Sequence, residues 1–317
     1  MVCVRALTSD TYNFLGKLKS ILSSNLILPS FKLEHHDPYD YFPLDPIAPN
    51  SQMGLRKFIP SEEDHRNRII QSDSQFEKFI EHKKNCLQAD FYHYFIKEHK
   101  KVCIKNVISD LSLLMGREEG SFSELSSCMQ EDVVIVCQEA DNNWVEAASI
   151  CFPNGWDAWG AVGNSFDHVH EKVPNIKNIV YGERTKKMIK AIIESNYCFE
   201  RVGAISINTS PEWIRHPAQA DPRESFTVNT DNLYIRFERQ VCKGYQEIGE
   251  NSSSVSGFVF LIKTYMLSFN RLTNPQRRCL LRTVEENPKG LYYHSWIAQH
   301  QDLLMEWISL RLNDSER

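Results

Sequence analysis

Two apolar strands joined by a tight turn, in the middle of the chain, constrain the fold more than any other feature. The β-branched run Val133–Cys137 precedes the turn signal DNN at 141–143, and a second apolar strand follows over Trp144–Phe152. β-branched and aromatic residues favour extended backbone, and Asp and Asn favour the turn between two paired strands. Further strands are predicted over 201–207, 233–240 and 257–269. The hairpin-type connections favour an antiparallel sheet over βαβ units.

Helices are predicted on either side of these strands in the sequence. Ser61 followed by three acids indicates a helix start, because serine caps the first turn and acidic side chains favour its positive end. Apolar residues at helical spacing extend the prediction. The predicted helices cover 61–86, 91–114, 185–196 and 293–310. With the sheet, they predict an α+β fold in which helices flank an antiparallel sheet.

The first fifty residues differ in pattern from the rest of the chain. Four prolines between 38 and 49 forbid a long helix, so residues 1–50 are predicted to be an irregular lead-in to one domain over 51–317. Phe14–Leu28 is too short and too polar to span a bilayer, and no transmembrane segment is expected. Asp10 is the single acid of the first thirty residues. An organelle-targeting signal therefore stays open beside a simple amphipathic helix or frayed end.

Composition limits the classes of function. The 317 residues are 42% hydrophobic, which is ample for a sizeable core. The net charge is -5 and no basic run interleaves with aromatics, so nucleic acid is not an expected partner. The nine cysteines are scattered singly without a CxxC pair, which indicates reduced thiols in a cytoplasmic protein. No GxGxxG or GxxxxGK[ST] string occurs, so electrons for any oxidase chemistry must come from elsewhere.

The segment over 151–174, CFPNGWDAWGAVGNSFDHVHEKVP, concentrates side chains that could surround a flat ligand. Trp156, Trp159 and Phe166 offer large apolar surfaces, and three glycines allow close backbone approach. His168 and His170 would share one face of an extended segment, and imidazole is the commonest metal ligand. The alternative is that both histidines are surface or hydrogen-bonded loop residues.

Four blocks of sequence, in the expected order, resemble the haem-dependent oxidative N-demethylase alpha-subunit-like family. They are MGLR at 53–56, QED at 130–132, CFPNGW at 151–156 with VHEKVP at 169–174, and RFERQ at 236–240 with FLIKTY at 260–265. The resemblance covers roughly Met53 to Trp307. Three positions depart from the family pattern: Asn154 replaces a serine, Lys172 replaces a proline, and the strand over 201–207 reads RVGAISI without the expected asparagine and tryptophan.

The resemblance implies a PAS-like antiparallel sheet flanked by helices, with a haem pocket between sheet and helices. It also implies a monooxygenase-type oxidative N-demethylation, in which O2 and a small secondary amine react and the methyl carbon leaves as formaldehyde. Electrons would come from a separate flavin or iron–sulfur reductase. The absence of a CxxCH string predicts haem b, bound without covalent attachment.

The same resemblance assigns candidate roles to individual residues. His170 matches the family's histidine and is the predicted axial ligand of the haem iron, with His168 as the fallback. Arg236 matches the family's first arginine and is predicted to bind a propionate or bound oxygen, unless it only forms an ion pair with Glu238. Glu131 could cap a strand, pair with an arginine or relay protons.

Trp156 and Tyr265 are also predicted to contact the cofactor, and either could receive a substrate ammonium group through a cation–π contact. Two other classes of function remain open. Outside enzymology, the altered strand over 201–207 favours a haem-binding sensor or carrier without turnover. A non-haem metalloprotein is the second alternative, in which Glu212 completes a facial triad with His168 and His170.

Overall fold

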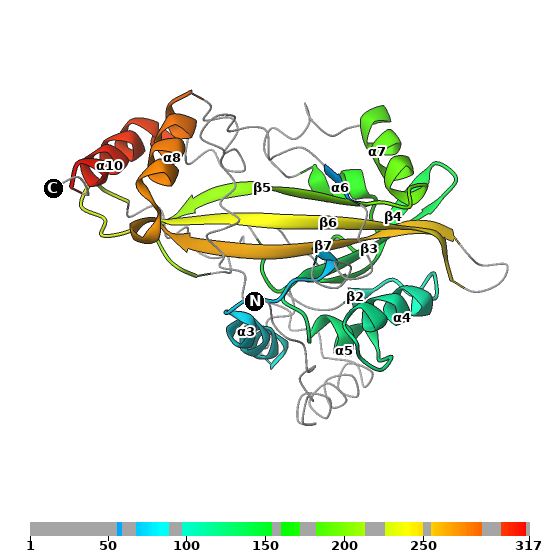
Figure 1. Cartoon of the computed structure of the whole chain (residues 1–317). Helices are drawn as coiled ribbons and strands as arrows, with labels where there is room; N and C mark the ends of the chain where they lie inside the picture. The colour runs from blue at the N-terminus through cyan, green and yellow to red at the C-terminus, as the bar shows by residue number, and fades with distance from the viewer. Residues whose placement is uncertain are drawn as a thin grey trace, which may run out of the picture.

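The computed structural model describes residues 56–58, 68–88, 97–153, 160–171, 182–212, 226–249, 255–286 and 299–314. A seven-stranded sheet in the order β1-β5-β6-β7-β3-β4-β2 forms its centre, and every strand pair in it is antiparallel (Figure 1). The strands are β1 Arg56–Phe58, β2 Lys97–Glu98, β3 Asp132–Glu139, β4 Asn142–Ser149, β5 Cys198–Asn208, β6 Tyr234–Ile248 and β7 Val255–Ser268.

Helices cover both faces of the sheet and one of its ends. Figure 1 shows α6 and α7 over one face, α3, α4 and α5 over the other, and α8 with α10 at the end where β7 finishes. The helices are α3 Phe76–Gln88, α4 Lys105–Leu114, α5 Phe122–Ser126, α6 Phe166–His170, α7 Glu183–Ile193, α8 Asn274–Glu286 and α10 Gln301–Asp314, and a 3-10 turn, η6 Phe269–Arg271, leads into α8. The α+β architecture predicted from the sequence is confirmed.

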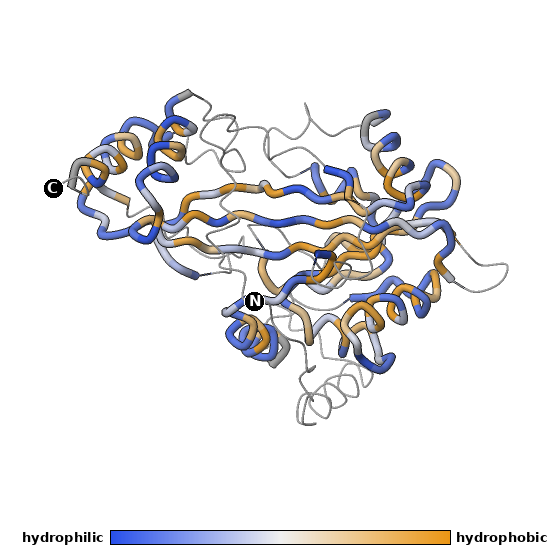
Figure 2. Tube along the Cα trace, in the orientation of Figure 1, coloured by the Kyte–Doolittle hydropathy of each residue, from blue (hydrophilic) through white to orange (hydrophobic). Residues whose placement is uncertain are grey.

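Alternation along the strands divides the core between the two faces. Successive side chains of a strand point to opposite faces, so neighbours in β3 enter different clusters. On the face that we call the α7 face, the cluster contains Val134, Val136, Ile189, Ile192 and Phe258. On the α4 face, it contains Val107, Leu111, Val133, Ile135 and Leu261. Figure 2 shows the hydrophilic stretch in the middle of β6, between more apolar ends.

The predicted hairpin is present, whereas two of the predicted helices differ from the structure. β3 and β4 pair from Val133↔Ser149 to Glu139↔Asn142. The helix predicted over 91–114 starts only at Lys105, because residues 97–98 pair with β4 and the amides of Lys101 and Val102 donate to the Glu146 side chain. Those amides are therefore bound to β4 and are not available to a helix.

The helix predicted over 61–86 is interrupted in the described residues, because residues 68–69 are helical whereas 70–75 are not. α3 begins at Phe76, and the amides of Gln71 and Asp73 donate to the side chains of Glu131 and Gln130. The predicted strand over 233–240 is longer, since β6 continues to Ile248 alongside β7. The predicted lead-in over 1–50 lies outside the described residues, and the single domain over 51–317 stays a prediction.

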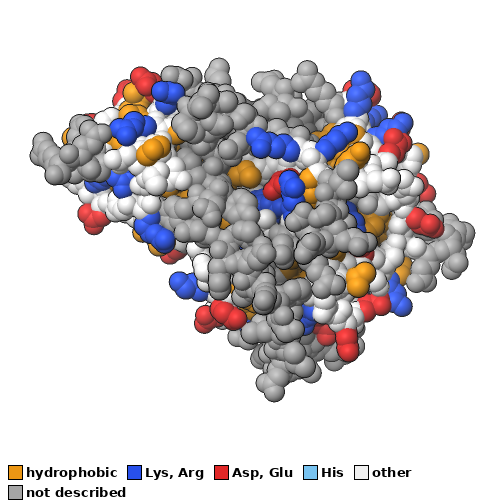
Figure 3. All heavy atoms as spheres, viewed as in Figure 1, with side chains coloured by type: hydrophobic (Ala, Val, Ile, Leu, Met, Phe, Trp, Pro, Cys, Tyr) orange, Lys and Arg blue, Asp and Glu red, His pale blue; other side chains and the backbone are white. Residues whose placement is uncertain are grey.

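The described surface agrees with a mixed charge pattern. Figure 3 shows basic and acidic side chains interspersed on the face in view. Within the described ranges, no helix combines the length and the apolar character that crossing a membrane requires.

Gly244→Ala is expected to lower the free energy of unfolding by about 1–3 kcal/mol, the usual cost of forcing extra volume into a packed region. In β6, its added Cβ would lie 2.1 Å from the backbone oxygen of Ile192 in α7, so the helix would have to shift. Gly203→Ala in β5 is the matched control, because nothing lies within 4 Å of its added Cβ. Urea unfolding measures both variants, and an unchanged midpoint for Gly244→Ala would contradict this close approach.

Candidate functional site

The block RFERQ places two arginines inside the protein, on opposite faces of the sheet. Arg236 and Glu238 point to the α7 face, whereas Phe237 and Arg239 point to the α4 face, because strand side chains alternate. Both arginines are at most 1% exposed. A buried guanidinium needs charge and hydrogen-bond partners, so each must be embedded in a polar network.

Arg236 is held by three partners on the α7 face. Its NH1 donates to Glu238 Oε1 at 2.9 Å, and its NH2 donates to the Phe152 carbonyl at 2.7 Å and to Thr264 Oγ1 at 3.2 Å. The Nε–H has no hydrogen-bond partner within the described part of the chain. The ion pair with Glu238, expected as the alternative role of Arg236, is therefore present, and one donor of the guanidinium remains for a further acceptor.

Glu238 extends this network towards β5. Its second oxygen accepts from Gln240 Nε2 at 2.8 Å, and Gln240 Oε1 accepts from Arg201 Nε at 2.5 Å. We call the set Arg201, Gln240, Glu238, Arg236 and Thr264 the arginine row. It contains two cations and one anion, so it favours an anionic group placed over it.

Asp132 anchors the segment that carries the Phe152 carbonyl. It lies on the α7 face opposite Ile262, and its two oxygens accept the amides of Cys151 at 2.8 Å and Phe152 at 3.0 Å. Burial raises the pKa of Asp132 to about 6, and Glu238 adds to the rise, while Lys83 and the two amides oppose it. The blocks QED, CFPNGW and RFERQ, distant in sequence, thus meet at one place.

His170 belongs to a helix and lies in a different setting from His168. Its Nδ1 is 2.7 Å from the Phe166 carbonyl, and the two rings lie 4.2 Å apart. Because a carbonyl only accepts, Nδ1 carries the proton and Nε2 keeps its lone pair. Burial lowers the pKa of His170, with Arg201 contributing to the decrease, which favours the neutral ring. The side chain is half-buried.

The prediction that His168 and His170 share a face is wrong. Both lie on α6, and residues two apart on a helix point to nearly opposite sides. His168 is exposed and its Nδ1 is 3.4 Å from Glu171 Oε2. No group of three His, Cys, Asp or Glu side chains suited to a metal ion occurs in the ranges that the structure describes, so the facial triad with the exposed Glu212 gains no support.

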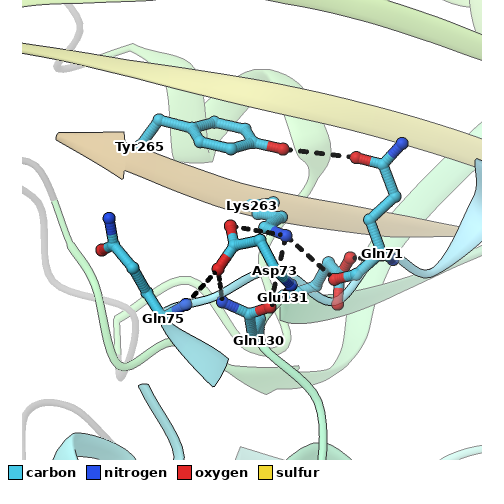
Figure 4. A network of polar contacts seen from close by, with 7 residues as sticks. All are labelled: Gln71, Asp73, Gln75, Gln130, Glu131, Lys263 and Tyr265. Atoms are coloured by element: carbon cyan, nitrogen blue, oxygen red, sulfur yellow. Dashed lines mark hydrogen bonds and ion pairs between the residues drawn. The ribbon is translucent and has the colours of Figure 1, made fainter. Parts of the chain in front are cut away.

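A second buried network lies under the α4 face (Figure 4). Lys263 Nζ is 3.0 Å from Asp73 Oδ2 and donates to the Gln71 carbonyl at 3.0 Å and to Gln130 Oε1 at 3.3 Å. Burial lowers the pKa of Lys263, although Asp73 and Glu131 oppose the decrease. Figure 4 shows how these side chains converge on the lysine from β7 and from the segments before α3 and β3.

Glu131 and Tyr265 belong to this second network. Glu131 Oε1 accepts the Gln71 amide at 2.8 Å, and its Oε2 has no hydrogen-bond partner among the described residues. The Tyr265 hydroxyl donates to Gln71 Oε1 at 3.2 Å, and its ring stacks on Phe237 at 4.9 Å. Lys263 Nζ already lies 5.3 Å from that ring, so the sheet's own cation occupies the cation–π position expected for a substrate.

The predicted site residues therefore fall into two groups. Arg236 and His170 are on the α7 face, Glu131 and Tyr265 are on the α4 face, and Trp156 lies outside the described residues. Sequence reasoning missed Thr264 as a partner of Arg236, and it missed Gln240 and Arg201, which continue the row beyond Glu238. The alternation of polar residues in R-x-E-x-Q was the available signal for Gln240, because it marks a polar strand face.

Comparison with known proteins adds one match over this framework. The family model described as "Haem-dependent oxidative N-demethylase, alpha subunit-like" matches residues 51–302. That range contains every strand of the sheet, the arginine row, α6 and both buried networks. No curated protein matches the chain.

Proposed function

The chain belongs to the haem-dependent oxidative N-demethylase alpha-subunit-like family, and from this premise we propose that it binds one haem b on the α7 face of its sheet. The proposed reaction is the O2-dependent removal of a methyl group from a small secondary amine. The proposal includes a PAS-like arrangement, in which the antiparallel sheet and the helices over it enclose the haem.

One observation carries this proposal: a buried arginine with an uncommitted donor lies on the same face as a histidine with a free ring nitrogen. Arg236 Nε–H has no partner among the described residues, and its network carries excess positive charge. His170 has the tautomer that a metal ligand needs, since ligating histidines usually donate their other N–H to a carbonyl or carboxylate. These features fit an iron ligand and a propionate partner.

Each of these residues has a defined part in the proposed mechanism. His170 Nε2 would hold the iron, and Arg236 would orient an anionic group through a charge-assisted hydrogen bond. Glu238, held by Gln240, fixes the Arg236 guanidinium through its ion pair. Asp132 positions the segment whose Phe152 carbonyl accepts a hydrogen bond from the same guanidinium. Haem bound there would supply the O2 chemistry that turns the methyl carbon into formaldehyde. Electrons would come from a separate flavin or iron–sulfur reductase.

Glu131 does not share this face, so a direct proton relay from its carboxyl group is not part of the proposal. Its position under the sheet, beside the Gln71 amide, instead supports a structural role in the second network. Tyr265 has the same setting. We retain both residues as supports of β3 and β7, whose opposite faces carry Asp132 and Thr264.

A haem sensor or carrier without turnover is the second candidate. The strand that departs from the family pattern is β5, and its pairing with β6 shifts between Gly203 and Ser206, where Ala204 has a φ of 51°. This irregularity lies next to Arg236, which pairs with Ser206. A change in β5 beside Arg236 favours either a different substrate or no turnover at all.

Titration of haem into the purified full-length protein is expected to give a saturable Soret band at one haem per chain. The physical reason is the combination of a neutral imidazole and a cationic row on one sheet face. The pyridine haemochrome spectrum measures stoichiometry and haem type. A Soret band that rises linearly without saturation would contradict specific binding. An assay of formaldehyde production with a reductase and dimethylamine then distinguishes an enzyme from a carrier. A carrier would bind haem normally and produce no formaldehyde.

A further inference from the structure

Two thiols and an imidazole lie together where α3 meets the segment after β4. Cys86 and His82 are one helical turn apart on α3, and Cys86 Sγ is 3.2 Å from His82 Nε2. The Cys151 thiol, 65 positions along the chain, donates a hydrogen bond to the Cys86 sulfur. Both sulfurs are buried in a small cluster with Phe79 and Phe152. Neither cysteine forms a disulfide.

The surroundings give the two sulfurs different protonation states. The hydrogen bond from Cys151 lowers the pKa of Cys86 to about 5, and His82 and Lys83 contribute to the decrease, while burial opposes it. The same hydrogen bond and burial raise the pKa of Cys151 well above its ordinary value. Together with the His82 ring nitrogen 3.2 Å from Cys86 Sγ, these opposite directions favour the thiolate form on Cys86 and the thiol form on Cys151, and the thiolate is the nucleophilic form.

His82 supplies the counter-charge to this thiolate. Burial lowers the pKa of His82, but the bond to Cys86, the Cys151 backbone and the charge of Asp132 outweigh it, so the net shift is upward. The imidazole also stacks on the Phe152 ring at 5.0 Å, which fixes its orientation. A thiolate beside an oriented imidazolium has a proton donor for a leaving group within reach.

The remaining buried cysteines with shifted pKa values lack this environment. Burial raises the pKa of each of them, so they stay protonated at neutral pH, namely Cys128, Cys137, Cys198 and Cys242. These four cysteines therefore serve as internal controls for Cys86, because they are buried like Cys86 but their pKa is shifted in the opposite direction.

We propose that Cys86 and Cys151 form a redox-active dithiol that hydrogen peroxide converts into a disulfide. The Cys86 thiolate attacks one peroxide oxygen, an S–O bond forms, the O–O bond breaks, and the departing hydroxide takes the proton of the His82 imidazolium to become water. Cys151 sulfur then attacks the Cys86 sulfenic acid. The S–S bond forms, the S–O bond breaks, and the second hydroxide leaves as water with the Cys151 proton. Two electrons pass from the sulfurs to the peroxide.

The disulfide would attach α3 to the segment that holds the candidate site. Cys151 directly precedes Phe152, and Asp132 binds the amides of both. The Phe152 carbonyl accepts from Arg236. Oxidation therefore acts on a partner of the arginine row, although the dithiol chemistry itself does not depend on haem and is tested without it.

The test treats reduced full-length protein with equimolar hydrogen peroxide and analyses non-reduced peptides by mass spectrometry. The expected product is a cross-linked peptide pair containing Cys86 and Cys151. In the same sample, Cys137 and Cys242 should stay reduced, and this comparison needs no variant. Cys151→Ser should stop at a sulfenic acid on Cys86, which a cyclic diketone traps, whereas Cys242→Ser should behave like wild type.

His82→Gln tests the thiolate assignment separately. It should slow peroxide oxidation of Cys86 by about tenfold at neutral pH, because it removes the His82 contribution to the lowered pKa of Cys86 and the proton donor for the departing hydroxide. The rate should recover at alkaline pH, and an unchanged far-UV spectrum confirms the fold. Oxidation of Cys86 no faster than that of Cys137, or a sulfenic acid that persists in the wild type, would overturn the proposal.

Discussion

His170→Ala is expected to remove or strongly weaken saturable haem binding, whereas His168→Ala leaves it nearly intact. His170 presents Nε2 with its lone pair, because Nδ1 is bound to the Phe166 carbonyl, and its half-buried ring lies against Phe166. Loss of the iron ligand should weaken haem affinity by at least about tenfold, since even the outer partners of metal ligands contribute about 10–100-fold. The exposed His168 has no such setting.

Haem titration monitored at the Soret band measures both variants. Added imidazole should restore part of the spectrum of His170→Ala, because a free ligand can occupy the vacated position. The matched control is His168→Ala on the same short helix, which tests whether any change in α6 disturbs binding. Retention of the wild-type ferric spectrum in both variants would place the iron ligand elsewhere.

Arg236→Ala is expected to lower both stability and haem affinity, and a comparison with Arg239→Ala separates the two effects. Breaking a buried ion pair typically costs about 3–5 kcal/mol, because it leaves an uncompensated charge. Arg236→Ala removes the ion-pair partner of Glu238. Arg239→Ala removes the nearer of two cationic partners of Glu200, whose Oε1 is 2.6 Å from Arg239 Nε and whose Oε2 is 3.5 Å from Arg68 Nε. Both variants should therefore melt at lower temperature than the wild type.

Only Arg236 lies on the proposed haem face. Haem should raise the melting temperature of Arg239→Ala by about as much as it raises that of the wild type, and should raise that of Arg236→Ala less. Thermal melts of apo and haem-loaded forms of both variants provide the measurement. If haem stabilises Arg236→Ala fully, the arginine is a scaffold residue that pairs with Glu238 and nothing more.

Local alternation predicted part of this site correctly. Alternation along a strand assigns Arg236 and Arg239, which are three residues apart, to opposite faces. Their partners agree, since Arg236 donates to the Phe152 carbonyl and Arg239 donates to Glu200 and the Arg68 carbonyl. The hairpin of β3 and β4 could also be predicted from the sequence, because β-branched residues and a DNN turn are local signals.

The remainder depends on contacts between distant parts of the sequence. Whether Tyr265 shares a face with Arg236 is decided by the register in which β7 pairs with β6, where Arg236 lies opposite Met266 and Phe237 opposite Tyr265. A slip of one residue in that register would move Tyr265 to the other face. The helical state of α6 also escaped prediction, because a five-residue helix capped by Ser165 is too short to show periodicity.

The middle of β6 carries one buried arginine on each face of the sheet. Arg236 joins the arginine row above the sheet, and Arg239 pairs in register with Lys263 of the network below it. Separating β6 from β7 would therefore break the contact of Arg236 with Thr264 and open the packing around two guanidinium groups and an ammonium group at once. We expect the two faces to open together, as one cooperative unit of folding.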